Sequence, residues 1–196
     1  MAVFFAELRG SSLPVEQTDV LPPPPPRINT LPETSKTGLI NLSGTAEASS
    51  TVEIYFNEKN VTSVVSDSDS KFTTGKLRLE EGKNSIYALA IDKAGNQSSS
   101  SEKYYVWFDE KPPELTISSP GDGAAFYGEQ EKSISIQGKT EPGVSLTLND
   151  RLVIIGSEGD FSTTFSLSEG ENRIKLIARD KAENEVEKEI TVIFFP

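Results

Sequence analysis

The sequence contains no cysteine and no histidine among its 196 residues. Without cysteine there is no disulfide and no thiolate nucleophile or ligand. Without histidine the commonest general base and the commonest nitrogen ligand for metals are also missing. Catalysis would require paired carboxylates or a serine with a lysine, and no recognisable motif of either kind occurs. We therefore expect a protein that is not an enzyme.

Basic residues are scarce, with 19 Lys and Arg against 30 Asp and Glu, which gives a formal net charge of −11. An acidic chain repels nucleic-acid phosphates and anionic lipids, so we expect no nucleic-acid partner. No apolar run reaches the length of about 20 residues that a membrane-spanning helix needs. The short apolar start, Met1 to Ala6, is either the end of a membrane anchor or an unstructured apolar tip. A membrane is expected as a partner only through such an N-terminal anchor.

One stretch occurs twice in the chain. Glu81 to Asn96 reads EGKNSIYALAIDKAGN, and Glu169 to Asn184 reads EGENRIKLIARDKAEN, with 9 of 16 positions identical. Two copies 88 residues apart indicate two copies of one domain. The boundaries that we predict are a proline-rich N-terminal tail over 1–26, a first domain over 27–110 and a second domain over 111–196.

The second copy gives the register of a strand. Ile174, Leu176 and Ala178 alternate with residues that include Lys175 and Arg179. Period-two alternation indicates a strand with one buried face, and the charged positions mark its outer face. By equivalence the inward positions of the first copy are Ile86, Ala88 and Ala90, while Tyr87 points outward.

Turn residues bound each copy. In the entering Glu-Gly-x-Asn motif, Gly82 and Gly170 can take a positive φ, and Asn84 and Asn172 can bond to nearby backbone. In the leaving Asp-Lys-Ala-x-Asn motif, we expect Asp92 and Asp180 to accept from turn amides and Asn96 and Asn184 to suit the left-handed region. The residues between such turns predict seven short strands in each domain and no helix.

The predicted strands are 27–31, 38–45, 51–57, 60–66, 70–79, 83–91 and 101–108 in the first domain, and 115–118, 132–139, 144–149, 151–156, 160–167, 171–179 and 186–195 in the second. Further inward positions are expected at Ile40, Leu42, Val52, Ile54, Phe56, Phe72, Ile134, Ile136, Leu146, Leu148, Phe161, Phe165, Val192 and Phe194.

Four motifs of the first copy resemble a known family: Ser43-Gly-Thr-Ala-Glu47, Asp67-Ser-Asp-Ser-Lys-Phe72, Leu79-Glu-Glu-Gly-Lys-Asn84 and Asp92-Lys-Ala-Gly-Asn96. They are similar to the tandem bacterial immunoglobulin-like domains of cell-surface and secreted proteins, including the glucodextranase-type accessory domain. The resemblance covers about residues 27–196. It implies an all-β chain of two tandem immunoglobulin-like β-sandwiches, preceded by a disordered or extended proline-rich tail.

Two proline-rich segments bear on the shape. Pro22 to Pro26 favour polyproline II, a semi-rigid rod of roughly 3.1 Å per residue, so we interpret the tail as a stalk, with a ligand for a proline-recognising domain as the alternative. The joint between the domains, Asp109 to Glu114, contains Pro112 and Pro113, which limit rotation. We expect the domains to lie end to end.

Acidic turns are the candidates for a metal. Asp67 and Asp69 alternate in one turn, and Asp92 and Asp109 lie near domain ends. Calcium takes six to eight oxygen ligands, but the glycine and glutamate spacing of an EF-hand is absent. Aspartate in turns commonly caps backbone amides. We therefore expect no metal or other cofactor and keep calcium at these four residues as the alternative.

The candidate ligand site is aromatic. In an immunoglobulin-type sandwich the third, sixth and seventh strands share a sheet. The registers above place Tyr55, Tyr87, Tyr105 and Trp107 on the outer face of that sheet. An exposed aromatic patch indicates a partner site, and flat rings also suit sugars, so the partner would be a protein or a glycan. The alternatives are that the tail or the neighbouring domain covers these rings, or that they bind nothing.

These observations predict a non-catalytic, surface-displayed module that acts as a rigid spacer and interaction or adhesion domain. The alternative is a carbohydrate-binding accessory region of a larger secreted or membrane-anchored enzyme. Both functions place the chain outside the cell or in the cell envelope, and we expect a monomer.

Overall fold

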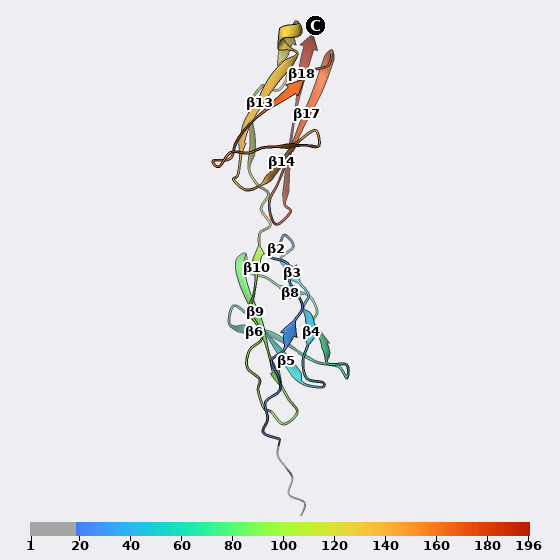
Figure 1. The fold of residues 1–196 in the computed structure, drawn as a ribbon, viewed down its shortest axis with the longest axis vertical. Helices are drawn as coiled ribbons and strands as arrows, with labels where there is room; N and C mark the ends of the chain where they lie inside the picture. Colours follow the sequence, from blue (N-terminus) through green and yellow to red (C-terminus); the bar gives the residue numbers. More distant parts are fainter. Residues whose placement is uncertain (1–18) are drawn as a thin grey trace, which may run out of the picture.

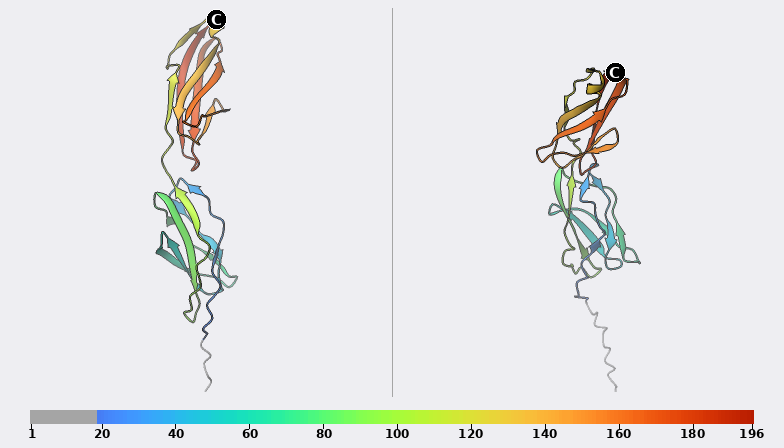
Figure 2. Two further views of the ribbon diagram at one scale, coloured as in Figure 1. Left: turned by 60° about the vertical axis from the view of Figure 1, so that its left-hand side comes forward. Right: turned by 45° about the horizontal axis from the view of Figure 1, so that its top comes forward.

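The computed structural model describes residues 19–196 as two β-sandwiches that lie end to end along the longest axis of the molecule (Figure 1). The first hydrophobic core gathers residues between Ile28 and Phe108, and the second gathers residues between Leu115 and Phe194. The views of Figure 2 show the same linear arrangement. The predicted boundary at residue 110 lies in the segment between these cores. Within residues 19–196, no helix has the length and apolar character needed to cross a membrane.

The first sandwich packs two sheets face to face. The five-stranded sheet has the order β2-β10-β9-β5-β6, the three-stranded sheet has the order β1-β4-β7, and β3 pairs with β8. The bounds are β1 (Arg27–Ile28), β2 (Thr34–Ser35), β3 (Leu39–Ile40), β4 (Ser43–Thr45), β5 (Thr51–Phe56), β6 (Lys59–Val65), β7 (Lys71–Thr73), β8 (Leu77–Arg78), β9 (Gly82–Ile91) and β10 (Tyr104–Phe108).

The second sandwich repeats this plan. Its sheets have the orders β12-β18-β17-β14-β15 and β11-β13-β16. The bounds are β11 (Leu115–Ser119), β12 (Ala125–Tyr127), η1 (Glu129–Glu131, a 3-10 turn), β13 (Ser133–Thr140), β14 (Ser145–Leu148), β15 (Arg151–Val153), β16 (Asp160–Ser166), β17 (Gly170–Arg179) and β18 (Glu185–Phe195).

The inward registers predicted from the repeat are confirmed. Ile174, Leu176 and Ala178 have no exposed surface, and neither do Ile86 and Ala88. The further predicted core positions are buried as well, except Phe165, which is only partly buried against the second core. All-β sandwiches with these alternating registers confirm the predicted fold class.

The structure differs from the prediction at the start of each domain. After its first strand, the chain crosses to the other sheet and adds β2 parallel to β10 and β12 parallel to β18. We missed both strands because each has two or three residues and depends on a partner distant in sequence. The predicted strands 38–45 and 70–79 are each interrupted, giving β3 with β4 and β7 with β8.

The two repeated turns act as expected in most respects. Asn84 is fully buried, and its amide donates to the carbonyls of Glu80 (2.7 Å) and Gly82 (3.0 Å), with Asn172 making the equivalent bonds. In the Asp-Lys-Ala-x-Asn turn, however, the left-handed residue is not the asparagine. It is the residue before it, Gly95 (φ 90°) or Glu183 (φ 66°), and the asparagine side chain instead donates to the aspartate of its own turn.

The described part of the predicted stalk packs on the first domain. Pro23 and Pro26 are buried, a spacing of three that matches the three residues per turn of a polyproline helix. Pro24, Pro25 and Pro26 line a pocket together with Ser100, Ser101, Glu102 and Tyr104, and the Tyr104 hydroxyl donates to the Ile28 carbonyl (3.0 Å). The last prolines therefore belong to the sandwich instead of projecting from it. The apolar start, Met1 to Ala6, lies outside the described residues.

Candidate functional site

The four predicted aromatic residues lie on the outer face of the five-stranded sheet of the first domain. Tyr55 is on β5, Tyr87 on β9, and Tyr105 and Trp107 on β10. Tyr105 and Trp107 are 54% and 52% exposed, whereas Tyr55 and Tyr87 are half-buried. We call this set the aromatic face. Within it, Tyr55 and Tyr87 contact each other, while Tyr105 and Trp107 follow one another along β10 toward the joint.

Tyr55 and Tyr87 are directly opposite each other on adjacent strands and stack, with ring centroids 5.0 Å apart and planes inclined by 8°. The Tyr55 hydroxyl donates to Glu53 (2.9 Å), and the Tyr87 hydroxyl donates to Glu58 (2.9 Å). The carboxylate of Glu53 raises the pKa of Tyr55, while partial burial and then Glu58 raise the pKa of Tyr87. Each ring thus packs one face against the other tyrosine, and each hydroxyl donates to a carboxylate.

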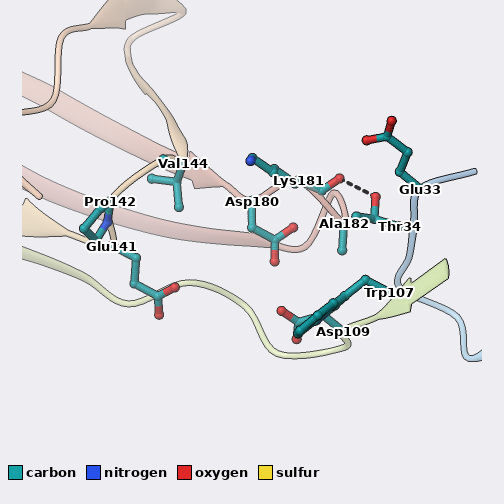
Figure 3. A pocket seen from close by; sticks show the side chains of 11 residues that line it. Glu33, Thr34, Trp107, Asp109, Glu141, Pro142, Val144, Asp180, Lys181 and Ala182 are labelled. Carbon is teal, nitrogen blue, oxygen red and sulfur yellow. Dashed lines mark hydrogen bonds between the residues drawn. The ribbon is translucent and has the colours of Figure 1, made fainter. Parts of the chain in front are cut away.

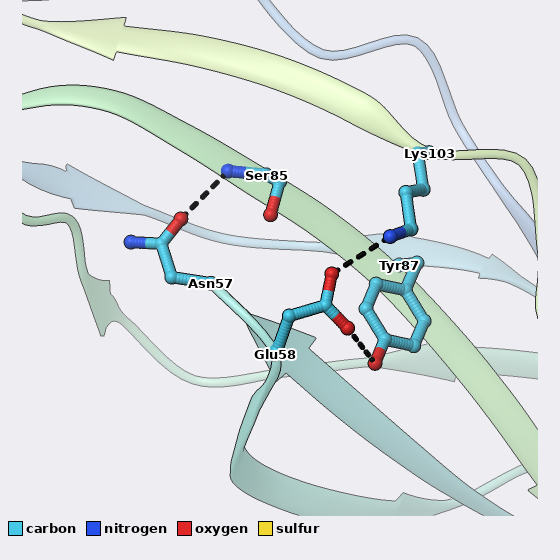
Figure 4. A network of polar contacts seen from close by, with 5 residues as sticks. All are labelled: Asn57, Glu58, Ser85, Tyr87 and Lys103. Carbon is cyan, nitrogen blue, oxygen red and sulfur yellow. Dashed lines mark hydrogen bonds and ion pairs between the residues drawn. The ribbon is translucent and has the colours of Figure 1, made fainter.

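Glu58 connects this pair to Lys103, which directly precedes β10 (Figure 4). It follows Asn57 in a two-residue turn where both residues have positive φ, as tight hairpins require. Its carboxylate accepts from Lys103 (2.7 Å) and from Tyr87, and Lys103 is the main cause of the lowered pKa of Glu58. Asn57 accepts from the Ser85 amide (2.9 Å), which fixes the turn against β9.

Lysine side chains lie over the rings of Tyr105 and Tyr87. Lys83 Nζ is 4.0 Å from the ring centroid of Tyr105, and Lys103 Nζ is 5.0 Å from that of Tyr87. Such cation–π contacts contribute roughly 0.5–1 kcal/mol at exposed sites. A flat ligand such as a sugar would have to displace a lysine to stack on these tyrosines. Around Tyr87 and Tyr105 the aromatic face is therefore an interleaved aromatic and charged surface, not an open platform.

Trp107 is the next outward residue after Tyr105 on β10 and lies at the joint between the domains. It lines a pocket of about 450 Å³ (Figure 3). The other lining residues are Glu33, Thr34 and Asp109 from the first domain and Glu141, Pro142, Gly143, Val144, Asp180, Lys181 and Ala182 from the second. The expectation that the neighbouring domain covers the aromatic face thus applies in part to Trp107, which keeps half of its surface exposed.

Three hydrogen bonds cross the joint. Thr34 Oγ1 donates to the Lys181 carbonyl (2.8 Å), and Lys36 Nζ donates to the Glu183 carbonyl (3.2 Å). The Asn184 side chain donates to the Asp109 carbonyl (2.8 Å). The Asp-Lys-Ala-x-Asn turn of the second domain therefore makes all three contacts. Sequence reasoning missed this role, although the repetition of the turn and the prolines before Glu114 were the available signals.

Three of the four aspartates considered for calcium cap backbone amides of their own turns. Asp67 Oδ1 accepts from the amides of Asp69 and Lys71, Asp92 Oδ1 accepts from those of Ala94 and Asn96, and Asp109 Oδ1 accepts from that of Lys111. The Asn96 side chain is the main cause of the lowered pKa of Asp92. Among residues 19–196 no group of three or more acidic side chains is placed to hold a metal ion. The four calcium candidates are not brought together.

The comparisons with known proteins agree with this architecture. The family model described as glucodextranase, domain B, matches residues 113–194. Bacillopeptidase F of Bacillus subtilis is 28% identical over 155 residues. That alignment covers 78% of this chain and 10% of the relative, so the chain spans about a tenth of the length of the curated relative that it matches.

Among solved structures, the fibronectin(III)-like modules of Clostridium thermocellum CbhA superpose with a TM-score of 0.54 at 18% identity. The match covers 87% of this chain and 94% of that one, so both sandwiches and their order in the chain are included. At this identity the similarity concerns the fold alone. The protein is a tandem of two immunoglobulin-like domains, the second of which matches the glucodextranase domain B family.

Proposed function

We propose that this protein is a non-catalytic spacer that holds two immunoglobulin-like domains in a fixed line as part of a larger extracellular or envelope protein. The observation that carries the proposal is the joint, where three hydrogen bonds from one turn connect the domains. A flexible connection would leave these donors and acceptors to water. The fold supports an accessory role, because domains of this architecture serve as spacers, binding modules and appendages of enzymes alike.

The linker is a second argument for a rigid joint, because hydrogen bonds hold its backbone at both ends. The Asp109 amide donates to the Ser35 carbonyl (3.0 Å), and its carbonyl accepts from Asn184 (2.8 Å). At the other end the Glu114 amide donates to Glu141 (3.2 Å), and the Glu114 carbonyl accepts from Thr140 (2.7 Å). With Pro112 and Pro113 between these anchors, few backbone dihedrals remain free to bend the joint.

The proposal is tested by whether the domains tumble together. We expect ¹⁵N relaxation of the whole chain to fit one elongated rotor, and Thr34→Val combined with Asn184→Ala to give two domains with shorter, separate correlation times. Thr116→Val is the matched control, because Thr116 also donates to a backbone carbonyl, that of Lys139 (3.2 Å), but within the second domain. Independent tumbling of the unmodified domains would refute the spacer function.

The second candidate is a carbohydrate-binding accessory region of a larger enzyme. It is favoured by the half-exposed rings of Tyr105 and Trp107. The matched family is also named for a domain of glucodextranase, and the relative is named as a peptidase. In this function the aromatic face would bind a glycan, or a protein partner, while the catalytic centre lies elsewhere in the polypeptide.

A glycan array probed with the whole chain distinguishes the two functions. Binding that is lost in Trp107→Ala and in Tyr105→Ala, but kept in Tyr127→Ala, would assign the aromatic face to a sugar. Tyr127 is an exposed aromatic residue of the second domain, outside this face (64% exposed). If the chain binds no glycan and tumbles as one body, only the spacer function remains supported.

Display outside the cell is part of the proposal and has its own test. On intact source cells, added protease should remove the epitopes of both domains, and an anchored form should remain with the membrane fraction after washing. Retention inside protease-treated cells would contradict surface display.

A further inference from the structure

The pocket at the joint, which we call the joint pocket, has acidic walls. Four carboxylates and one ammonium group, that of Lys181, line it. The carboxylates belong to Glu33, Asp109, Glu141 and Asp180, and those of the last three are directed toward the space between the domains (Figure 3). The lining side chains therefore carry a formal charge of −3 at pH 7.

The cations of the chain do not neutralise this charge. Among the ion pairs formed within residues 19–196, none includes a carboxylate of the joint pocket. Lys111, two residues after Asp109 in the linker, pairs instead with Glu81 (2.6 Å). Lys36, from the first domain, donates to the Glu183 carbonyl. The pocket thus keeps a negative charge that an external cation can neutralise.

Two of the carboxylates also have unused acceptor capacity. Asp109 Oδ1 accepts from the Lys111 amide, and Glu141 Oε1 accepts from the Glu114 amide. The second oxygen of each, Oδ2 of Asp109 and Oε2 of Glu141, accepts no hydrogen bond from the part of the chain that the structure describes. These two oxygens can therefore accept from a ligand without loss of the linker contacts.

Trp107 supplies an aromatic wall beside the carboxylates. Lysines lie over two tyrosine rings of the same sheet, but within residues 19–196 no lysine or arginine lies over the Trp107 ring, which is 52% exposed. Tryptophan is the strongest cation–π partner among the aromatic side chains. Pro142, Val144 and Ala182 extend this wall with apolar surface. The joint pocket therefore combines an unoccupied aromatic face with unpaired negative charge.

The spacing of the carboxylates favours an extended organic cation over a metal ion. Within residues 19–196 no three acidic side chains are placed to hold a metal. A guanidinium group presents five N–H donors in one plane, so it reaches acceptors on separate residues while its flat face lies on an aromatic ring. The apolar stem of an arginine suits an apolar wall. The volume of about 450 Å³ lies within the range of roughly 300–1,000 Å³ typical of ligand pockets.

We propose that the joint pocket binds an arginine side chain from an extended segment of a partner protein. The guanidinium would stack on Trp107 and donate to Asp109 and Glu141. Because free arginine carries its own carboxylate, the acidic walls favour an arginine within a peptide over the free amino acid. The inference concerns the same joint as the proposed function and goes beyond it, since the ligand would contact both domains.

The test is isothermal titration calorimetry of the whole chain with an acetylated and amidated Gly-Gly-Arg-Gly-Gly peptide. The matched peptide has citrulline in place of arginine, which keeps the planar shape and removes the charge. We expect the citrulline peptide to bind about tenfold more weakly or not at all. The arginine peptide should also change the fluorescence of Trp107, and added salt should weaken its binding.

Variants assign the binding to the joint pocket. Trp107→Ala, and separately Asp109→Asn combined with Glu141→Gln, should each weaken the arginine peptide about tenfold. The two amide substitutions keep the oxygens that accept the linker amides, so they remove charge without releasing the linker. Glu47→Gln is the matched control and should leave binding unchanged. Glu47 lines the pocket at the opposite end of the first domain, which has no aromatic lining residue.

The contrary outcomes are distinct. Equal affinity for the two peptides, or an affinity that survives both sets of substitutions, would overturn the proposal, because general attraction to an acidic chain would then explain the binding. Free arginine that binds as tightly as the peptide would overturn the assignment to a partner protein. A chain that tumbles as one rotor but binds no arginine peptide overturns only this inference. Peptide binding by domains that tumble separately refutes only the spacer function.

Discussion

A single residue distinguishes the two copies of the Asp-Lys-Ala-x-Asn turn. The left-handed position is Gly95 in the first domain and Glu183 in the second, at φ 90° and 66°. The left-handed region costs an L-residue with a Cβ about 1–2 kcal/mol, and glycine avoids this cost. The second domain therefore has a strained turn at the joint, while the first has a relaxed one.

We expect Glu183→Gly to raise the free energy of unfolding of the second domain by about 1 kcal/mol, and Gly95→Glu to lower that of the first by a similar amount. Urea titration followed by circular dichroism measures both. The joint contact is retained in Glu183→Gly, because Lys36 bonds to the backbone carbonyl of this residue. If both variants shift stability in the same direction, strain at this position is not the cause.

Ile174 tests the register from which the fold was predicted. It has no exposed surface, whereas Ile177 on the same strand points outward and is half-buried. Ile174→Ala should lower the free energy of unfolding by about 2–5 kcal/mol, because it leaves a cavity in the second core. Ile177→Ala is the matched control and should cost clearly less. Equal losses in urea titrations would contradict the register.

At the scale of elements, the ionised aspartate of the repeated turn makes the free energy of unfolding depend on pH. Asp92 accepts from the Ala94 and Asn96 amides and from the Asn96 side chain, and these bonds, that of the Asn96 side chain first, lower the pKa of its carboxyl below the usual range. A carboxylate with a lowered folded-state pKa contributes stability that is fully present above its unfolded-state pKa. That contribution is lost as the pH falls through the folded-state pKa.

The decrease in the free energy of unfolding at acidic pH should therefore depend on Asp92. Between about pH 5 and pH 2 the free energy of unfolding of the first domain should fall less steeply in Asp92→Asn than in the unmodified chain. Fluorescence of Trp107, the single tryptophan of the chain, reports unfolding of this domain during urea titrations. Parallel slopes for the two proteins would show that the turn does not hold the ionised form preferentially.

The same turns lead to an expectation about calcium. The carboxylates of Asp67, Asp92 and Asp109 already accept backbone amides of their own turns. We expect millimolar calcium to leave the melting temperature unchanged, whereas a specific site would add about 2.7 kcal/mol at a hundredfold excess over Kd. A rise of several degrees that Asp67→Ala or Asp109→Ala abolishes would favour the calcium alternative over the expectation of no metal.

Most strands could be predicted because the chain contains two copies of the domain. Where one copy leaves the inward positions of a strand ambiguous, the equivalent strand of the other copy indicates them. Tyr104 to Phe108 is apolar throughout, and only its match with the second copy orients Val106 inward, where the structure buries it. The parallel strands β2 and β12 could not be predicted in this way. Their sequences, Thr34-Ser35 and Ala125-Phe-Tyr127, do not alternate, and their pairing is decided by the sandwich that has already formed.

The aromatic face was predicted in part. Alternation placed the four rings on the outer surface, but it could not show that Tyr55 and Tyr87 stack or that lysines lie over Tyr87 and Tyr105. Those contacts depend on side-chain conformations across three strands. The environment of Trp107 depends on how the two domains meet, which no periodicity within one domain encodes.

At the scale of the whole molecule, the position of Trp107 makes it a reporter of the joint. Opening the joint should expose more of its ring, so acrylamide should quench its fluorescence more strongly in Asn184→Ala than in the unmodified chain. Asn96→Ala is the matched control, because it breaks the equivalent bond at the opposite end of the first domain. Identical quenching of the three proteins would mean that the second domain does not shield Trp107.

The parallel pairing of the second strand of each domain with its last strand has a mechanical consequence. Pulling the ends of the chain apart drives β12 and β18 in opposite directions along their own axes, and the same holds for β2 and β10. The bonds Ile193 N to Ala124 O (2.9 Å) and Gly128 N to Phe195 O (2.7 Å) are then loaded together in shear, as are Trp107 N to Glu33 O (2.8 Å) and Asp109 N to Ser35 O (3.0 Å). Under tension each sandwich must break such a set at once instead of opening bond by bond, so short strands of two or three residues act as the clamps that bear the load.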